Sequence, residues 1–296
     1  MPPLEPEIHP LPARSFYSRC RVVLYSAFGD ESHDEANARV FAVAGLFGSE
    51  DDWNSHNGKW LARTGGKIFH ASDCETDQGD FAGIDHAENM RLYKDLTQIL
   101  CASRIMGYGM AIDLAGWREF FPGVLDDVPY YRSFREVVLR CGNWARWVIP
   151  QGTVKFTFDS RIESNYNAGV LYTYMAQQPE WNGYFDEEIS FASRKLVGIQ
   201  AADLYVREVM KHLDNIVGPT RRPTRRSFEA LQKVKRFGAD FLMREHFEDF
   251  RRKFESVAAS VGMDRDRYAA WLAKHGLNDN ISSRHRYIIE LDREGE

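Results

Sequence analysis

The chain has 296 residues, of which 44% are hydrophobic and 13% aromatic, and its formal net charge is −5. This length and composition suit one large or two modest domains with a real core, and they exclude disorder as a description of the whole chain. The Pro-rich start lacks the pattern of a signal peptide, and no window approaches the run of about 18 apolar residues that a membrane span needs. The four cysteines, at positions 20, 74, 101 and 141, show no metal-ligand spacing. We therefore expect a cytoplasmic protein without a membrane segment, a zinc site or a disulfide framework.

The first part of the chain predicts two adjacent strands, an insertion and a third strand. Apolar runs rich in β-formers at 22–28 and 40–47 are joined by a short polar loop, which is typical of a hairpin. Residues 51–103 predict one helix before and one helix after a Gly-rich break at 64–66. A further apolar run at 105–112 predicts the third strand.

The second part of the chain alternates helices and strands. Over 130–148, apolar side chains recur at spacings of four and three, which predicts an amphipathic helix. Strands are expected at 154–158 and 188–192, and helices at 167–176 and 198–213. Three leading strands followed by alternating helices and strands imply an α/β fold, in which helices flank a mixed five-stranded sheet.

Composition divides the chain into three parts. Residues 1–19 form a Pro-rich N-terminal segment, and residues 20–215 form the core, with its helical insertion at about 51–103. Residues 216–296 are expected to form a basic linker and a C-terminal helical appendage. Over 214–253, eleven Lys and Arg stand against six Asp and Glu, so the rest of the chain carries about −10. Such a basic segment suits either solubility or a phosphate-binding surface.

Asp203 lies where a helix is expected to face the core. At 100° per residue, Ile199, Val206 and Leu213 fall within about 40° of one direction on the last core helix. Asp203 falls inside the same apolar stripe, whereas Glu208 falls on the opposite, polar side. A carboxylate that faces a core needs a counter-charge or a metal ion. Asp203 is therefore either a salt-bridge or capping residue, or a metal ligand.

Two further aspartates terminate expected strands. Asp30, with Glu31 beside it, ends the first strand, and Asp159 ends the fourth. Each alone is ordinary turn chemistry, but three carboxylates that meet at one sheet edge repel one another unless a cation neutralises them. Because hard oxygen ligands favour Mg²⁺ or Mn²⁺, we expect one of these ions at Asp30, Asp159 and Asp203.

Three short elements resemble a bacterial family catalogued as domain of unknown function 3800. They are Gly29-Asp30-Glu31-Ser32, Phe69-His70-Ala71-Ser72-Asp73 and Gly198-Ile199-Gln200-Ala201-Ala202-Asp203-Leu204, of which the last is the most specific. The resemblance spans about residues 20–215. That family is similar to the ribonuclease H-like superfamily, whose members place acidic ligands on the first strand, the fourth strand and the last helix. The resemblance therefore implies a ribonuclease H-like fold and a metal site at Asp30, Asp159 and Asp203.

One ligand of the superfamily's ribonucleases, a Glu on the first core helix, has no counterpart in this sequence. Glu136 is the acidic residue available there, but a helical wheel turns it away from the apolar stripe, so we reject it as a ligand. A fourth metal ligand is then expected from Glu31, or from His70 and Asp73 in the insertion. His70 could ligate metal, orient water or donate a structural hydrogen bond.

These residues favour a nuclease that hydrolyses nucleic-acid phosphodiesters with two Mg²⁺ or Mn²⁺ ions. Asp30 would bridge the ions, and Asp159 and Asp203 would each hold one, with Glu31 and His70 as further catalytic candidates. The candidates for contact with nucleic acid, DNA or RNA, are Arg194, Lys195, Gln200, Arg221, Arg222, Arg225 and Arg226. Arg194 and Lys195 could equally lie in a solvated loop. Trp53 and Trp60 could stack on bases, but their spacing is more typical of helix packing.

Two other functions are compatible with the same residues. The fold could serve as a non-catalytic module that binds nucleic acid or a protein, or as a metal-dependent phosphoesterase acting on a small nucleotide. A protein partner or a second copy of the chain, forming a homo-oligomer, could dock on the C-terminal helices, although packing on the chain's own core is equally expected. The apolar residues in question are Phe228, Leu231, Phe241, Phe247, Phe250 and Phe254. The sequence has no G-x-S-x-G elbow and no phosphate-cradling loop, which argues against serine-hydrolase and NTPase chemistry.

Overall fold

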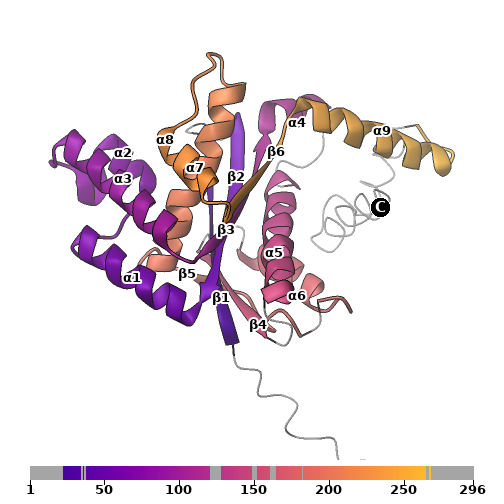
Figure 1. Ribbon diagram of the computed structural model, residues 1–296. Coiled ribbons are helices and arrows are strands. Elements are labelled where there is room, and N and C mark those ends of the chain that lie inside the picture. The colour runs from indigo at the N-terminus through magenta and orange to yellow at the C-terminus, as the bar shows by residue number, and fades with distance from the viewer. Residues whose placement is uncertain are drawn as a thin grey trace, which may run out of the picture.

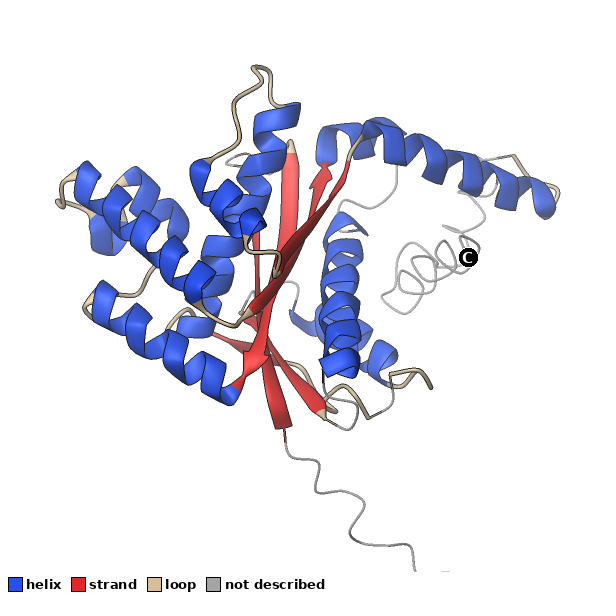
Figure 2. Cartoon of the chain, in the orientation of Figure 1, coloured by secondary structure: helices blue, strands red, loops and turns tan. Residues whose placement is uncertain are grey.

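The computed structural model describes residues 23–34, 36, 38–120, 128–148, 152–160, 165–181, 183–264 and 267. Over these residues, six strands form one sheet with helices on both faces (Figures 1 and 2). The strands are β1 (Val23–His33), β2 (Val40–Ser49), β3 (Met106–Asp113), β4 (Thr153–Asp159), β5 (Ser190–Ala192) and β6 (Phe237–Leu242). The helices are α1 (Glu50–Thr64), α2 (Ala71–Thr76), the 3-10 turn η2 (Gly79–Phe81), α3 (His86–Ala102), α4 (Leu114–Phe120), α5 (Val128–Val148), α6 (Asn165–Ala176), α7 (Val197–Val217), α8 (Arg226–Lys233) and α9 (Arg244–Ser260).

The strands follow the order β5-β4-β1-β2-β3-β6 across the sheet. β1, β2 and β3 are antiparallel neighbours, whereas β4 runs parallel to β1, β5 to β4, and β6 to β3. The sheet is therefore mixed, as the sequence predicted, and the expected hairpin of the first two strands is confirmed. β1 lies between β2 and β4, which brings the carboxyl ends of the parallel strands β1 and β4 side by side.

Two hydrophobic cores hold the helices to the two faces of the sheet. One core packs α1, α2, α3, α7 and α8 on one face, with Trp60, Phe69 and Tyr205 among its fully buried side chains. The other packs α4, α5, α6 and α9 on the opposite face through side chains such as Phe134 and Phe156. In Figure 1 the first group lies to the left of the sheet and the second to the right. α7 packs on β1 and β2, so this helix crosses the centre of the sheet.

β1 is longer than the sequence predicted. The expected strand ended at residue 28, but β2 pairs with β1 as far as His33. The loop that follows is held by Asp34, whose Oδ1 accepts the backbone N–H groups of residues 38–40 at 2.8–3.0 Å. The prediction that Asp30 ends the first strand was therefore wrong. Asp30 lies inside β1 because the antiparallel pairing with β2 continues past the point where β4 stops.

The C-terminal part is not a purely helical appendage, and the sheet has six strands where the sequence predicted five. Residues 237–242 form β6, which pairs in parallel with β3 at the edge of the same sheet. The pairing is fixed by contacts far apart in the chain: the Tyr108 hydroxyl donates to Asp240 Oδ2 at 2.7 Å, and Tyr205 donates to the Gly238 carbonyl at 2.6 Å. A six-residue edge strand between two helices leaves no local pattern strong enough to reveal such a pairing.

The apolar side chains considered for a partner or a second copy pack mainly inside the chain itself. Phe228 and Leu231 of α8 are buried in the core that contains α3 and α7. Phe247 of α9 is fully buried against Trp117, with ring centroids 5.7 Å apart. The side chains of Phe250 and Phe254 lie outside the described residues. The packing alternative is therefore the one observed for α8 and for Phe247.

Among the helices of the described ranges, none has both the length and the apolar character needed to cross a membrane. Cys74, Cys101 and Cys141 are free thiols, and Cys20 lies outside the described residues.

Candidate functional site

Asp30 and Asp159 lie side by side on one face of the sheet. The last parallel pair between β1 and β4 joins Gly29 to Phe158, so the two aspartates come next on their strands. Successive side chains of a strand point to opposite faces. Because Phe158 packs in the α5 core, Asp159 points to the other face, where α7 lies. Phe28 packs against the start of α7, which places Asp30 on this same face.

Asp203 approaches the two strand aspartates from α7. The residue is 5% exposed, in agreement with the inward orientation that the helical wheel indicated. Its Oδ2 accepts the backbone N–H of Ala71, the first residue of α2, at 2.7 Å. The helix can come this close to β1 because position 198 is a glycine: a Cβ at Gly198 would lie 2.4 Å from the Phe28 ring. The carboxylate is thus held over the sheet by the packing of α7 and by the start of α2.

Gln200, which the sequence suggested as a nucleic-acid contact, has a structural role instead. Its side chain is buried, and its Oε1 accepts the Trp60 indole N–H at 2.9 Å and the Phe69 backbone N–H at 3.1 Å. Its Nε2 donates to the Arg194 carbonyl at 2.8 Å. Gln200 therefore joins α1, the insertion and the start of α7, and it is withdrawn as a nucleic-acid contact. Trp60 is likewise a packing residue.

The three aspartates act on one another electrostatically. Burial raises the pKa of Asp30 well above its ordinary value of 3.8, and the negative charges of Asp203, Glu31 and Asp159 raise this pKa further. Asp30 Oδ1 accepts the backbone N–H of Glu31 at 2.7 Å, but Oδ2 is buried and has no hydrogen-bond partner among the described residues. Burial also raises the pKa of Asp203, against the opposing effect of His70. Such a group needs a proton or a cation to be stable.

Two glutamates are set apart from the three aspartates. Glu31 is 7% exposed and follows Asp30 on β1, so strand alternation points its side chain to the α5 face. Its negative charge helps to raise the pKa of Asp30, but its side chain does not lie on the face of the sheet where the aspartates meet. Glu136 lies on α5, with its Oε1 3.5 Å from Arg135 Nη1, on the far side of the sheet from α7. This position agrees with its rejection as a metal ligand.

Arg194 is a cation at the edge of this acidic group, in contact with Asp159. Its Nε lies 3.4 Å from Asp159 Oδ2, and its side chain is 37% exposed. Burial lowers the pKa of the guanidinium, but the charges of four carboxylates outweigh this effect and hold the pKa above its ordinary value. These carboxylates belong to Asp203, Asp30, Asp159 and Asp73. Arg194 therefore interacts electrostatically with every aspartate that the sequence proposed as a metal ligand.

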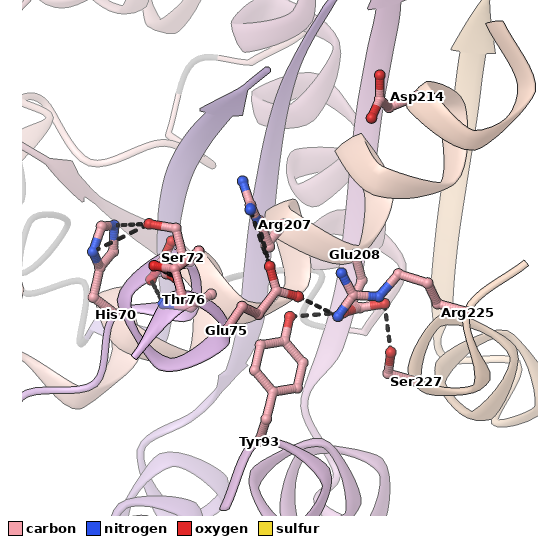
Figure 3. Close-up of polar contacts among 12 residues, drawn as sticks. His70, Ser72, Glu75, Thr76, Tyr93, Arg207, Glu208, Asp214, Arg225 and Ser227 are labelled. Carbon is pink, nitrogen blue, oxygen red and sulfur yellow. Dashed lines mark hydrogen bonds and ion pairs between the residues drawn. The ribbon is translucent and has the colours of Figure 1, made fainter. Parts of the chain in front are cut away.

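The insertion delivers His70 and Asp73 to the margin of the acidic group. His70 directly precedes α2, and its Nδ1 lies 3.0 Å from Asp73 Oδ2. The Ser72 hydroxyl lies 3.4 Å from both ring nitrogens of His70 (Figure 3). Both side chains stay partly exposed, at 25% for His70 and 33% for Asp73. The charge of protonated His70 acts on Asp203, so this exposed pair borders the buried carboxylates.

A buried ion network fastens the insertion to α7 and α8 (Figure 3). Glu75 of α2 pairs with Arg207 of α7 at 3.0 Å and with Arg225. Arg225 also pairs with Glu208 at 3.0 Å, and Glu208 accepts the Tyr93 hydroxyl at 2.6 Å. The sequence placed Glu208 on a polar helix face, which was wrong: the side chain is fully buried because α3 and α8 cover the outer side of α7. Arg225 is committed to this network, so it is withdrawn as a nucleic-acid contact.

Two other arginines of the basic segment, Arg221 and Arg222, lie near the far end of α7, whereas Arg226 follows Arg225 at the start of α8. Arg222 pairs with Asp214 at 2.6 Å, whereas Arg221 and Arg226 are exposed. At a rise of 1.5 Å per residue, Asp214 lies about 16 Å along the helix from Asp203. Exposed positive charge is therefore present on this side of the molecule, at a distance from the acidic group.

The acidic group offers the kind of ligands that a divalent cation prefers, but its side chains are too far apart to enclose one. Carboxylate oxygens are the ligands that Mg²⁺ and Mn²⁺ prefer, and the buried, unpartnered Oδ2 of Asp30 is a free donor among them. Within the described part of the chain, however, no three His, Cys, Asp or Glu side chains are close enough together to hold a metal ion. The donors gather at one place without forming a closed ligand set.

Comparison with known proteins yields similarity to solved structures alone. No family model matches the chain, and no curated protein matches it. The chain is similar to Bst-RNase HIII in complex with Mn²⁺, with 13% identity and a TM-score of 0.39 over 72% of this chain and 62% of that one. It is also similar to a point mutant of Bst-RNase HIII, with 15% identity and a TM-score of 0.41 over 73% of this chain and 63% of that one. The chain thus spans less than two thirds of either neighbour. At these identities and scores, no residue role and no activity carry over from them.

Proposed function

We propose that this chain is a divalent-metal-dependent nuclease of ribonuclease H-like architecture that hydrolyses nucleic-acid phosphodiesters. The observation that carries the proposal is the gathering of Asp30, Asp159 and Asp203, from two adjacent parallel strands and the helix that crosses them. One oxygen of this group is buried and unpartnered. A carboxylate whose pKa is raised by burial and by neighbouring negative charge, as that of Asp30 is, stays ionised only beside a cation, and a hard divalent ion meets this need.

Each residue of the group has a distinct part in this proposal. Asp30, Asp159 and Asp203 would hold Mg²⁺ or Mn²⁺, which supplies an activated water and stabilises a leaving oxygen when bound. The Ala71 N–H fixes the orientation of Asp203 Oδ2 through its 2.7 Å hydrogen bond. His70 lies on the exposed margin of the group, where its ring can hold or release a proton beside a substrate.

Positive charge near the group supports a phosphate-containing polymer as the substrate. Lys195 is exposed directly beside Arg194, at the start of α7. Arg221 is exposed near the far end of the same helix and Arg226 is exposed at the start of α8, where they can contact phosphates further along a strand without reading its bases. A small nucleotide would not reach both places, because the two ends of α7 are about 30 Å apart.

A cleavage assay tests this function. Labelled single-stranded, duplex and hybrid substrates are incubated with Mg²⁺ and with Mn²⁺, using wild-type protein and the variants Asp159→Asn and Asp203→Asn. Asp51→Asn, which changes an exposed carboxylate on α1, is the matched control. We expect cleavage by wild type and control, and a loss of at least about 10- to 100-fold in the two site variants, since even partners of metal ligands contribute this much.

Two outcomes would contradict the proposal. Binding of nucleic acid without cleavage in either metal would indicate a non-catalytic module. Hydrolysis of mononucleotide esters alone would indicate a phosphoesterase for small substrates. Circular dichroism of every variant shows whether a lost activity reflects the site rather than the fold.

A further inference from the structure

The guanidinium of Arg194 lies against Asp159, with its Nε 3.4 Å from Oδ2, and it interacts electrostatically with Asp30 and Asp203. We propose that Arg194 is the internal counter-ion of Asp30, Asp159 and Asp203: it offsets part of their negative charge while no divalent ion is bound, and it leaves them when one binds. The inference rests on the proposed function, because it describes how the same site exchanges one cation for another. It assigns Arg194 a role in metal affinity that a simple phosphate contact would not have.

The main chain of Arg194 is fixed, so that its side chain is the part that can move. β5 ends at Ala192, which is paired with Asp159 at the end of β4. The Ser160 N–H donates to the Ala192 carbonyl at 3.0 Å, and Gln200 Nε2 donates to the Arg194 carbonyl at 2.8 Å. These two hydrogen bonds hold the main chain of residues 192–194 beside the end of β4 and the start of α7. The guanidinium is thereby delivered to the carboxylates from a rigid base.

The guanidinium is held by charge more than by hydrogen bonds. Its Nε lies 3.4 Å from Asp159 Oδ2, yet within the described residues this buried Nε has no hydrogen-bond partner. By contrast, Arg244 makes two hydrogen bonds to Glu119, at 2.6 and 2.5 Å. Arg–carboxylate pairs gain most of their strength from such two-bond geometry. The looser Arg194 pair is one that a doubly charged ion can replace.

The side chain of Arg194 is partly exposed, so it can move into solvent when it leaves the carboxylates. It is 37% exposed, and the neighbouring Lys195 is exposed as well. Once released, the guanidinium would lie with Lys195 at the mouth of the site, where both can face a phosphate.

The direction in which metal affinity changes when Arg194 is removed distinguishes the counter-ion role from two alternatives. If Arg194 orients Asp159 for the metal, its removal weakens metal binding. If it contacts phosphate alone, its removal leaves metal binding unchanged. A counter-ion that competes with the metal predicts the opposite, because deleting its charge leaves the aspartates more negative and more attractive to a divalent ion.

The test is a Mn²⁺ titration of EDTA-stripped full-length protein, followed by the loss of the free-ion electron paramagnetic resonance signal. Arg194→Gln should bind Mn²⁺ about tenfold more tightly than wild type, since one unit charge leaves the immediate surroundings of the ion. Arg194→Lys keeps the charge and should stay within about threefold of wild type. Lys195→Gln removes an equal charge from the exposed neighbour and should also stay close to wild type, because solvent screens it.

A second measurement avoids the variants. In wild-type protein, the Nε–H of Arg194 should exchange faster with solvent, by nuclear magnetic resonance, once Mg²⁺ is added. The counter-ion role is overturned if Arg194→Gln binds Mn²⁺ equally or more weakly while wild type binds, or if the Nε–H exchange does not change; the nuclease proposal then stands. If neither wild type nor any variant binds Mn²⁺, both proposals are overturned.

Discussion

Replacement of Asp30 by Asn should stabilise the metal-free protein while it removes a proposed metal ligand. The amide keeps the shape of the side chain. It also keeps an oxygen that can accept the Glu31 N–H, which in the wild-type protein lies 2.7 Å from Asp30 Oδ1. It deletes a negative charge that burial and the carboxylates of Asp203, Glu31 and Asp159 all disfavour. Stability and function are therefore expected to oppose each other at this position, as they do where a site holds unfavourable charge for the sake of its ligand.

The magnitude follows from the raised pKa of Asp30. In the unfolded chain this carboxyl titrates near its ordinary value of 3.8, whereas in the folded protein its pKa is well above that value. Between the two values the folded state binds more protons, so the stability of wild type is fully present below about pH 4 and falls as the pH rises through the folded-state pKa. The fall is about 1.4 kcal/mol for each pH unit between the two pKa values, and each 1 kcal/mol lowers the melting temperature by about 2–4 °C in a domain of about 150–250 residues.

Thermal unfolding in EDTA, from about pH 4 to about pH 8, measures this effect. The melting temperatures of wild type and Asp30→Asn should nearly coincide at the acid end and separate in favour of the variant as the pH rises toward neutrality. Glu229→Gln, which changes an exposed carboxylate of α8, should follow wild type throughout. The reasoning is refuted if Asp30→Asn melts below wild type at neutral pH, or if the difference between them does not depend on pH.

Two further substitutions probe the parts that hold α7 in place. Glu208→Gln should lower the free energy of unfolding by about 1–2 kcal/mol, because the hydroxyl of Tyr93 or of Ser227 loses its acceptor and Arg225 is left with Glu75 as its charged partner, while the loss of a carboxylate whose pKa is raised by burial offsets part of this cost; a urea titration that shows no loss of stability would contradict this. Gly198→Ala should cost about 1–3 kcal/mol and weaken Mn²⁺ binding together, because the new Cβ would meet the Phe28 ring at 2.4 Å and displace Asp203. Unchanged melting and unchanged Mn²⁺ affinity would show that α7 tolerates the extra methyl group.

Local periodicity was sufficient to predict most of the elements. The helix expected at 130–148 is α5 (Val128–Val148), and the strand expected at 40–47 is β2 (Val40–Ser49). The inward direction of Asp203 also follows from the sequence, since an apolar stripe sets which side of a helix meets the core. Periodicity thus predicts which side of an element faces the core.

Contacts between distant segments decided the remainder. Glu208 lies on the side of α7 that the sequence marks as polar, and it is buried because α3 and α8 pack over it. Its partners Tyr93 and Arg225 come from those other elements, so no local pattern could have identified them or Glu75 as a network.

The candidate site shows the same division. The amino-acid sequence by itself determined which carboxylates are placed at strand and helix positions that can converge, because residue type and spacing depend on the chain alone. The tertiary structure decided which of them share a face, that Glu31 does not, and that the Arg194 guanidinium lies among them. The physical reason is that charge interactions depend on distance in space, and this distance is set only when the strands pair and α7 packs across them.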